Sequence, residues 1–207
     1  MSARDELLAR VRAAVSHSAP ALEPFAPAHR RSDFAAFAAQ LAAAGGSAVG
    51  PLAPGDVAAR AAELIPRLAA GGRVVASDAA LLRLGTGPWQ PLPSGAPPHS
   101  LADVAVAVLC GALAVAENGA VGLDGREARP RALPVLCEHL VLLVDARRIV
   151  PDMHAALAQL PDAALEHHHF TFVAGPSKTA DIEGELVLGA HGARSLTVLV
   201  VEAPAAD

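Results

Sequence analysis

Hydrophobic residues recur at intervals of three and four in three segments of the first third of the chain. Such spacing places them on one face of an α-helix. The predicted helices run from Ser2 to Val15, from Ser32 or Asp33 to Gly45-Gly46, and from Asp56 to Gly71-Gly72. Residues 73–76 then have the character of a buried strand, and Ser77-Asp78 begins another short helix. This alternation of helices and a strand is typical of an α/β fold.

Short apolar runs rich in β-branched residues predict strands in the second half of the chain. They lie at residues 104–109, 120–123, 140–144, 170–174 and 196–201, with a helix between two of them from Pro151 or Asp152 to Leu160. The simplest arrangement is a set of parallel strands with helices on both faces. Prolines interrupt residues 85–100, which predicts a long loop that either covers a site or packs its tryptophan, Trp89, against the core.

The proline-rich segment 16–31 divides the chain into two parts. Its prolines cannot continue a helix, so the segment is expected to connect an N-terminal helical extension to a main domain. We place the helix and connector in residues 1–31 and the α/β domain in residues 32–207. The N-terminal helix is expected to pack on this domain or on a partner.

Charge and composition exclude several classes of function. A formal net charge of −5 and the lack of tyrosine argue against nucleic-acid binding. The longest apolar stretch, residues 104–116, is shorter than the roughly 20 residues that span a bilayer, and the charged N-terminal segment does not fit a secretory signal. We therefore expect a cytoplasmic protein. The two cysteines, Cys110 and Cys137, are too few for an iron-sulfur cluster.

Several familiar motifs fail on the residue types that their chemistry requires. Ser177-Lys178-Thr179 lacks the glycines of a P-loop, and residues 85–90 lack the third glycine of a dinucleotide-binding fingerprint. Gly175-Pro-Ser177 lacks the second glycine of a nucleophile elbow. The three histidines at 167–169 alternate between the faces of a strand, so a solvated lead-in to that strand is a simpler interpretation than a metal site. We expect neither a cofactor nor a metal.

The segment that begins at Gly175 is the first candidate for a binding site. It follows an apolar strand and is expected to enter a short helix, where backbone N–H groups, the Ser177 and Thr179 hydroxyls and the Lys178 ammonium could converge on an anion. Such a site suits a small carboxylate or phosphate. The alternative is that Ser177 or Thr179 only caps the helix while Asp181 complements its dipole, and the residues alone do not separate these interpretations.

Glu117-Asn118-Gly119 is the second candidate. A carboxylate at the end of an apolar segment, beside a residue pair that readily turns the chain, would be held at the rim of the sheet and could act as a nucleophile or general base. On spacing alone, an ordinary hairpin turn with an exposed glutamate is the simpler explanation.

Both candidates coincide with the motifs of one known family. The run from Gly175 to Glu183, followed by Leu186-Val-Leu-Gly189 and His191-Gly192, closely resembles the C-terminal signature of LUD-domain proteins, a group that includes lactate-utilisation protein C. Ala116-Glu117-Asn118-Gly119 is similar to the Ala-Glu-Thr-Gly pattern of the same family. The resemblance extends from about residue 104 to residue 201.

This resemblance implies a fold, partners and a site. The fold would be a three-layer α/β sandwich around a mostly parallel sheet, as in sugar-phosphate isomerases and CoA transferases. The chain would work beside iron-sulfur subunits that oxidise L-lactate to pyruvate, itself holding no cluster. The residues that would line or support its site, with the adjoining glycines and amide, are Glu117, Asn118, Gly119, Gly175, Ser177, Lys178, Thr179, Asp181 and His191.

Asn118 departs from the family pattern, which has threonine at this position. The run from Glu117 to Gly122 also resembles the glutamate loop of CoA transferases, in which the glutamate attacks a thioester. Three functions therefore stay open: a non-iron accessory subunit, an independent enzyme with Glu117 as nucleophile, and a ligand-binding regulator without catalysis. The oligomeric state, a homo-oligomer included, also stays open.

Overall fold

The computed structural model describes residues 2–14, 31–93, 95, 97–127, 130–160, 169–180 and 184–202. Within them the helices are α1 (Ala3–Ala14), α2 (Phe34–Ala43), α3 (Val57–Ala69), α4 (Asp78–Leu84), α5 (Leu133–Leu136) and α6 (Met153–Ala158). The strands are β1 (Ser47–Leu52), β2 (Arg73–Ala76), β3 (Gln90–Pro91), β4 (Val104–Cys110), β5 (Leu113–Val115), β6 (Ala120–Asp124), β7 (His139–Asp145), β8 (Ile149–Val150), β9 (Phe170–Val173), β10 (Lys178–Thr179), β11 (Val187–Leu188) and β12 (Ser195–Val201).

Four of the five predicted helix starts carry side-chain caps, at Ser2, Asp33, Ser77 and Asp152. An Asp33 carboxylate oxygen accepts the N–H of Ala36 at 2.8 Å at the start of α2, and the Ser77 hydroxyl accepts the N–H of Ala80 at 3.2 Å at the start of α4. Asp56 differs, because it ends a short 3-10 turn with helical backbone angles and its side chain makes no capping hydrogen bond to α3. The third helix thus begins one residue after its predicted start at Asp56, and Asp56 does not cap it as its residue type would suggest.

The main sheet is parallel throughout, with the strand order β1-β12-β7-β4-β2-β3. The pattern of apolar runs predicts four of its strands, β2, β4, β7 and β12. It misses the edge strands β1 and β3, because Gly50-Pro51 and Pro91 lie inside them and proline removes a donor from the ladder. Glycine and proline are tolerated in β1 and β3, since each of these edge strands has only one neighbour in the sheet.

A second sheet has the order β8-β5-β6-β9 and is mostly antiparallel. The run at residues 104–116, expected as one strand and a turn, contains both β4 and β5. Because the short turn after β5 returns the chain directly, β6 pairs antiparallel with it, and β9 then pairs antiparallel with β6. The expectation that β6 and β9 belong with the parallel strands is wrong.

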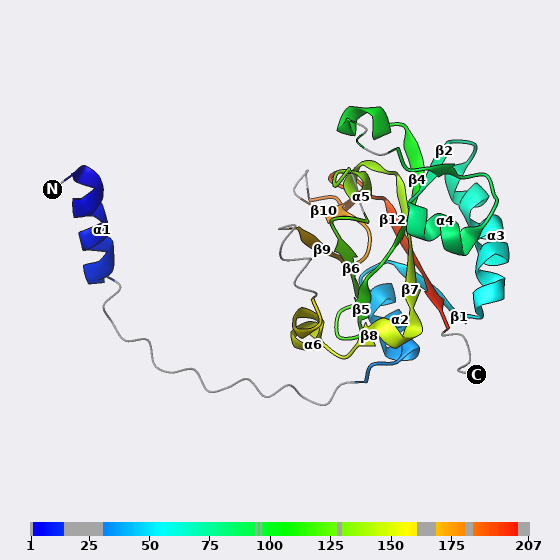
Figure 1. The fold of residues 1–207 in the computed structure, drawn as a ribbon, viewed down its shortest axis with the longest axis horizontal. Helices are drawn as coiled ribbons and strands as arrows, with labels where there is room; N and C mark the ends of the chain where they lie inside the picture. The colour runs from blue at the N-terminus through cyan, green and yellow to red at the C-terminus, as the bar shows by residue number, and fades with distance from the viewer. Residues whose placement is uncertain are drawn as a thin grey trace.

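The two sheets and the helices form stacked layers (Figure 1). One face of the main sheet packs against α3, α4 and the buried Trp89. The other face packs against α2, α5 and the inner face of the second sheet, and this region forms the largest core cluster. The outer face of the second sheet is covered by α6 through Ala156. The predicted α/β fold, with a mostly parallel sheet between helices, is confirmed, and Trp89 packs against the core.

The N-terminal helix α1 has no buried residue, and Figure 1 shows it apart from the α/β body. Ser2 and Asp5 cap it reciprocally, with the Ser2 N–H donating to the Asp5 carboxylate at 2.9 Å and the Asp5 N–H donating to the Ser2 hydroxyl at 3.3 Å. Its apolar residues Leu7 and Val11 are 60% and 50% exposed. Among the described residues, no helix has the length and hydrophobicity needed to cross a membrane.

Candidate functional site

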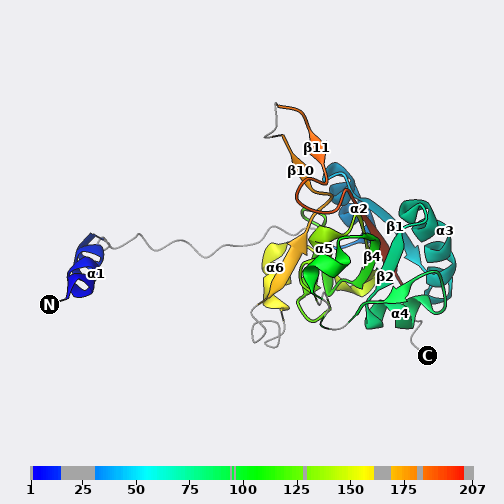
Figure 2. The ribbon, with the colours of Figure 1, turned by 90° about the horizontal axis from the view of Figure 1, so that it is seen from above.

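The segment after β9 forms a hairpin. Lys178 pairs with Leu188 and Thr179 with Val187 in the antiparallel strands β10 and β11, which project from the body in Figure 2. The expected short helix at this position is therefore wrong, and so is an anion site built on its N–H groups. Asp181 lies outside the described residues, so its predicted role is not placed.

Ser177 holds the start of this hairpin against the segment that follows it. Its N–H donates to the carbonyl of Ala193 at 2.9 Å, and its carbonyl accepts the N–H of Gly189 at 3.0 Å. The Ser177 hydroxyl accepts the N–H of His191 at 3.3 Å. These bonds place the predicted site residues Ser177 and His191 side by side, although the β10–β11 hairpin separates them in the sequence.

The C-terminal end of α2 supports the same region. Gly45 and Gly46 donate their N–H groups to the carbonyls of Ala42 and Leu41, which is the hydrogen-bond pattern of a Schellman cap. A side chain at Gly45 would place its Cβ 2.6 Å from the Lys178 ammonium, and one at Gly175 would place its Cβ 2.3 Å from the carbonyl oxygen of Ala44. The ammonium therefore lies at the negative end of the helix dipole of α2.

Lys178 and His191 line one pocket of about 370 Å³, together with Gly175 and Ser177. Its apolar wall comes from α5, β7, β9 and β12, with Val135, Leu140, Val173 and Leu196 among the contributors. No acidic residue is among the described residues that line it. A protonatable imidazole and an ammonium beside an apolar wall can bind a carboxylate or phosphate that carries a short hydrocarbon part.

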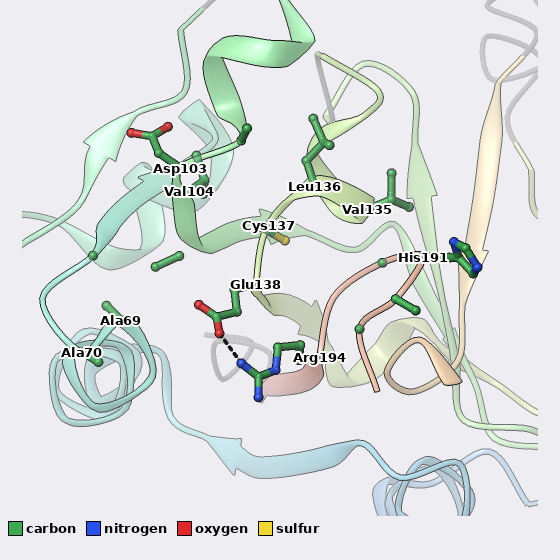
Figure 3. Close-up of a pocket in the computed structure, with 16 residues that line it drawn as sticks. Ala69, Ala70, Asp103, Val104, Val135, Leu136, Cys137, Glu138, His191 and Arg194 are labelled. Carbon is green, nitrogen blue, oxygen red and sulfur yellow. Dashed lines mark hydrogen bonds and ion pairs between the residues drawn. The ribbon is translucent and has the colours of Figure 1, made fainter. Parts of the chain in front are cut away.

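A larger hollow of about 730 Å³ adjoins this pocket at His191 and lies at the amino ends of the parallel strands (Figure 3). Glu138 and Arg194, which form an ion pair of 2.6 Å, are part of its lining, and alanine and glycine residues form much of the rest. His191 lines both hollows, so it marks the boundary between them. This hollow differs from the Lys178 pocket in that two carboxylates, Asp103 and Glu138, line it, which disfavours an anion there.

The Glu117-Asn118-Gly119 turn lies elsewhere, between β5 and β6. A Glu117 carboxylate oxygen accepts the N–H of Met153, the first residue of α6, at 3.1 Å. Gly119 has a φ of +70°, and a Cβ there would lie 2.4 Å from the backbone nitrogen of Leu41 in α2. Both motifs thus pack on α2, but Glu117 is not among the residues that line the Lys178 pocket. The turn between β5 and β6 is the one that the hairpin explanation expects, but its glutamate is half-buried and hydrogen-bonded and not exposed.

Glu127 forms a polar junction at the carboxyl ends of β2 and β4 that the sequence did not indicate. Its carboxylate accepts the N–H of Cys110 at 2.7 Å and also the hydroxyl of the buried Ser77. Connections leave β2 and β4 toward opposite sides of the sheet, which is where α/β sheets usually bind ligands. Here the Glu127 carboxylate of the chain itself accepts the backbone N–H of Cys110 at this edge of the sheet.

Burial raises the pKa of both cysteine thiols to about 12, and the nearby Glu127 carboxylate adds to the effect at Cys110. Neither thiol is therefore a nucleophile near neutral pH. Among the described residues, no three histidine, cysteine or acidic side chains gather as metal ligands. His167 and His168 lie outside the described residues, whereas His169 precedes β9 and bonds to the Thr171 hydroxyl at 3.3 Å.

Sequence reasoning placed Lys178 in the site but missed its apolar wall. Lys178 is the only lysine in the chain, against fifteen arginines, and this count is a signal that could have singled it out. The wall formed by Val135 of α5 had no such signal, because a helix of four residues has no detectable periodicity.

The sequence also matches a known family. Residues 100–201, about half of the chain, match the family model of the LUD domain. The chain belongs to the LUD-domain family. The matched region contains the Glu117 turn, the Lys178 hairpin and every residue that lines the Lys178 pocket. The sequence resemblance is thereby confirmed.

Curated relatives of this LUD domain carry the name lactate utilization protein C. The protein from Geobacillus kaustophilus is 34% identical over 93 residues, which cover 43% of this chain and 39% of that protein. The protein from Deinococcus radiodurans is 35% identical over 105 residues, which cover 50% of each chain. The match thus spans half or less of these relatives.

The fold is shared with a solved structure. A crystal structure of a DUF162 family protein from Deinococcus radiodurans superimposes with a TM-score of 0.59 at 19% sequence identity, over 84% of this chain and 99% of that one. At this identity the likeness concerns the fold, and it extends the agreement beyond the LUD match into the N-terminal half.

Proposed function

We propose that this LUD-domain chain is a non-iron accessory subunit of a lactate-utilisation system that oxidises L-lactate to pyruvate. In this role it binds a small organic anion in the pocket of Lys178 and His191. The names of the relatives support a role in lactate utilisation. The two cysteines are too few for the usual set of four cluster ligands, so in this proposal the redox chemistry belongs to iron-sulfur partners.

The observation that carries the proposal is that Lys178 and His191 both line a pocket with an apolar wall. L-Lactate and pyruvate each combine one carboxylate with a short carbon chain. The carboxylate fits the two nitrogen groups, the remaining atoms fit the wall of Val135 and Leu196, and no acidic group among the described lining residues repels the ligand.

A labelling experiment tests the binding site. Since Lys178 is the only lysine, a reagent that acetylates amines modifies only this side chain and the α-amino group. We expect L-lactate or pyruvate to slow acetylation of Lys178, followed by mass spectrometry, while the α-amino group reacts at an unchanged rate. Equal rates at Lys178 with and without either acid would contradict binding in this pocket.

Calorimetry with two variants gives an independent measurement. Lys178→Ala should weaken binding of the same acids about tenfold, because it removes a charge-assisted hydrogen bond. Arg67→Ala is the matched control, since it removes one cation from α3 on the other side of the main sheet. Equal losses of affinity in both variants would mean that the effect comes from the overall charge and not from the pocket.

Affinity purification of the tagged chain from lactate-grown cells tests the accessory role. We expect cysteine-rich iron-sulfur proteins to co-elute together with lactate-oxidising activity. A solitary chain without that activity would contradict the role as a subunit.

A further inference from the structure

A separate pocket of about 380 Å³ lies at the carboxyl ends of three neighbouring strands of the main sheet. Its lining includes Pro54 after β1, Asp145 at the end of β7, and Val201 and Glu202 where β12 ends. The other wall comes from α3 and α4, which lie side by side on one face of the sheet (Figure 1). We call this the carboxyl-edge pocket. None of the described residues that line it also lines the Lys178 pocket.

The topology of the main sheet favours a ligand at this place. β1 and β7 flank β12 in the strand order. β1 continues into α3 on one face of the sheet, whereas β7 continues into β8 of the second sheet on the other face. Open α/β sheets usually bind their ligands outside the carboxyl ends of strands whose connections leave toward opposite sides. The volume of the pocket is also within the range of small-molecule sites.

Part of the carboxyl-edge pocket is apolar. Leu82 of α4 lines it with 89% of its surface exposed, and the buried Val57 and Val201 form its base. A single exposed leucine is common on protein surfaces, but this one stands beside a hollow whose base is also apolar. An aliphatic group bound here would cover Leu82, and its hydrocarbon would be removed from water.

The charged residues of the pocket are two arginines and two carboxylates. Asp145 accepts hydrogen bonds from the Arg147 N–H at 2.8 Å and from its guanidinium at 2.8 Å and 3.2 Å. These bonds hold the pKa of the Asp145 carboxyl below its usual value, and the charge of the nearby Arg83 adds to the effect. Within the described part of the chain, no hydrogen bond or ion pair joins the side chain of Arg83 or Glu202 to another group. The pocket therefore offers a ligand one guanidinium and one carboxylate, and it has no net charge.

We propose that the carboxyl-edge pocket binds a free aliphatic α-amino acid, with its carboxylate on Arg83, its ammonium on Glu202 and its side chain over Leu82. A ligand with a single charge would match one of the two charged groups and be repelled by the other, whereas a zwitterion matches both. Because no ion pair joins Arg83 to Glu202, the ligand does not have to break one. This site is independent of the anion site proposed at Lys178 and adds a second ligand to the chain.

Calorimetry of the full-length protein with L-leucine tests the proposal, together with three compounds that each lack one of its features. 4-Methylpentanoate lacks the ammonium group, 3-methylbutylamine lacks the carboxylate, and glycine lacks the hydrocarbon. We expect each of them to bind at least about tenfold more weakly than L-leucine, because one charge-assisted contact or the apolar contact is lost. Equal affinity for 4-methylpentanoate, or no binding of L-leucine at millimolar concentrations, would overturn the proposal.

Variants locate the ligand. Arg83→Ala and Glu202→Ala should each weaken L-leucine binding about tenfold. Arg67→Ala should leave it unchanged, since it removes a cation from the last turn of α3, away from Val57 in the first turn. All three side chains are exposed, so these variants should fold, and thermal unfolding checks this. Unchanged affinity in Arg83→Ala and Glu202→Ala would overturn the assignment to this pocket, and so would an equal loss in Arg67→Ala.

Acetylation of Lys178 separates this inference from the proposed function. L-Leucine should leave the rate of acetylation unchanged, whereas L-lactate or pyruvate should slow it. If L-leucine protects Lys178, the amino acid binds in the Lys178 pocket and the carboxyl-edge proposal fails. If neither acid protects Lys178 while Arg83→Ala still weakens L-leucine, the proposed anion site fails and the carboxyl-edge site stands.

Discussion

At the scale of single residues, the carboxylate of Glu117 has a structural partner. It accepts the N–H of Met153 at 3.1 Å and so ties the β5–β6 turn to the start of α6. We expect Glu117→Ala to lower the free energy of unfolding by about 1.5 kcal/mol, since a hydrogen bond to a charged acceptor is lost. Glu117→Gln keeps an oxygen acceptor and should lose about half as much. Urea denaturation measures both.

Glu63→Ala is the control for Glu117, because Glu63 forms an exposed ion pair with Arg60 and should change stability by less than about 0.5 kcal/mol. A Glu117→Gln protein with wild-type stability but no turnover would instead indicate a nucleophile. In that case the independent-enzyme alternative would replace the accessory role.

The buried thiols predict a loss of stability in alkali. Their pKa is raised from 9.0 to about 12 in the folded chain, so above about pH 9 the unfolded state releases protons that the folded state retains. Below about pH 9 the thiols are protonated in both states, and their contribution to the free energy of unfolding is fully present. We expect the free energy of unfolding to fall by about 1.4 kcal/mol per pH unit for each thiol between about pH 9 and pH 11.

This titration is easy to isolate, because the chain has no tyrosine and a single lysine. Urea denaturation at several alkaline pH values measures the slope, and Cys137→Ala should remove about half of it. An unchanged slope in that variant would show that Cys137 does not titrate as its burial implies.

At the scale of elements, α2 connects the two family motifs, because Gly119 packs on its last turn and Gly175 on the residue that follows it. Asp33 caps this helix through the Ala36 N–H, so Asp33→Ala should lower the free energy of unfolding by about 1 kcal/mol. Asp56→Ala is the matched control: Asp56 precedes α3 without a capping bond, and its loss should be clearly smaller. Equal losses in thermal or urea unfolding would contradict the assigned caps.

The elements also show where sequence reasoning succeeds and fails. Long apolar runs such as β4 and β7 are recognisable because both faces are buried, and Asp33 and Ser77 mark helix starts by their chemistry. The β10–β11 hairpin was mistaken for a helix, since two-residue strands have no period to detect.

The sequence pointed to residues that line one pocket but not to how the fold gathers them, and their roles there stay a prediction. A hairpin and the bond between Ser177 and the His191 N–H bring Ser177, Lys178 and His191 to this pocket. The separation of Glu117 from this pocket depends on how the second sheet stacks on the first. Such long-range packing has no signature in local spacing.

At the scale of the whole molecule, the question is whether α1 packs on the α/β body or on a partner. No residue of α1 is buried, and isolated helices of its length are marginal in water, so its apolar face is expected to gain stability from a partner. Deletion of residues 2–30 should leave the melting temperature of the body within about 2 °C of the full chain, because no core contact is lost. Differential scanning calorimetry measures this change.

The same deletion should remove the co-elution of iron-sulfur proteins if α1 is the segment that docks on them. Leu7→Asp with Val11→Asp in the full chain is the sharper variant, since it alters the exposed apolar face and preserves the chain length. Loss of partners with an unchanged melting temperature would assign α1 to assembly. A large drop in melting temperature on deletion would instead mean that α1 packs on the body, and unchanged co-elution would place the docking surface on the α/β domain itself.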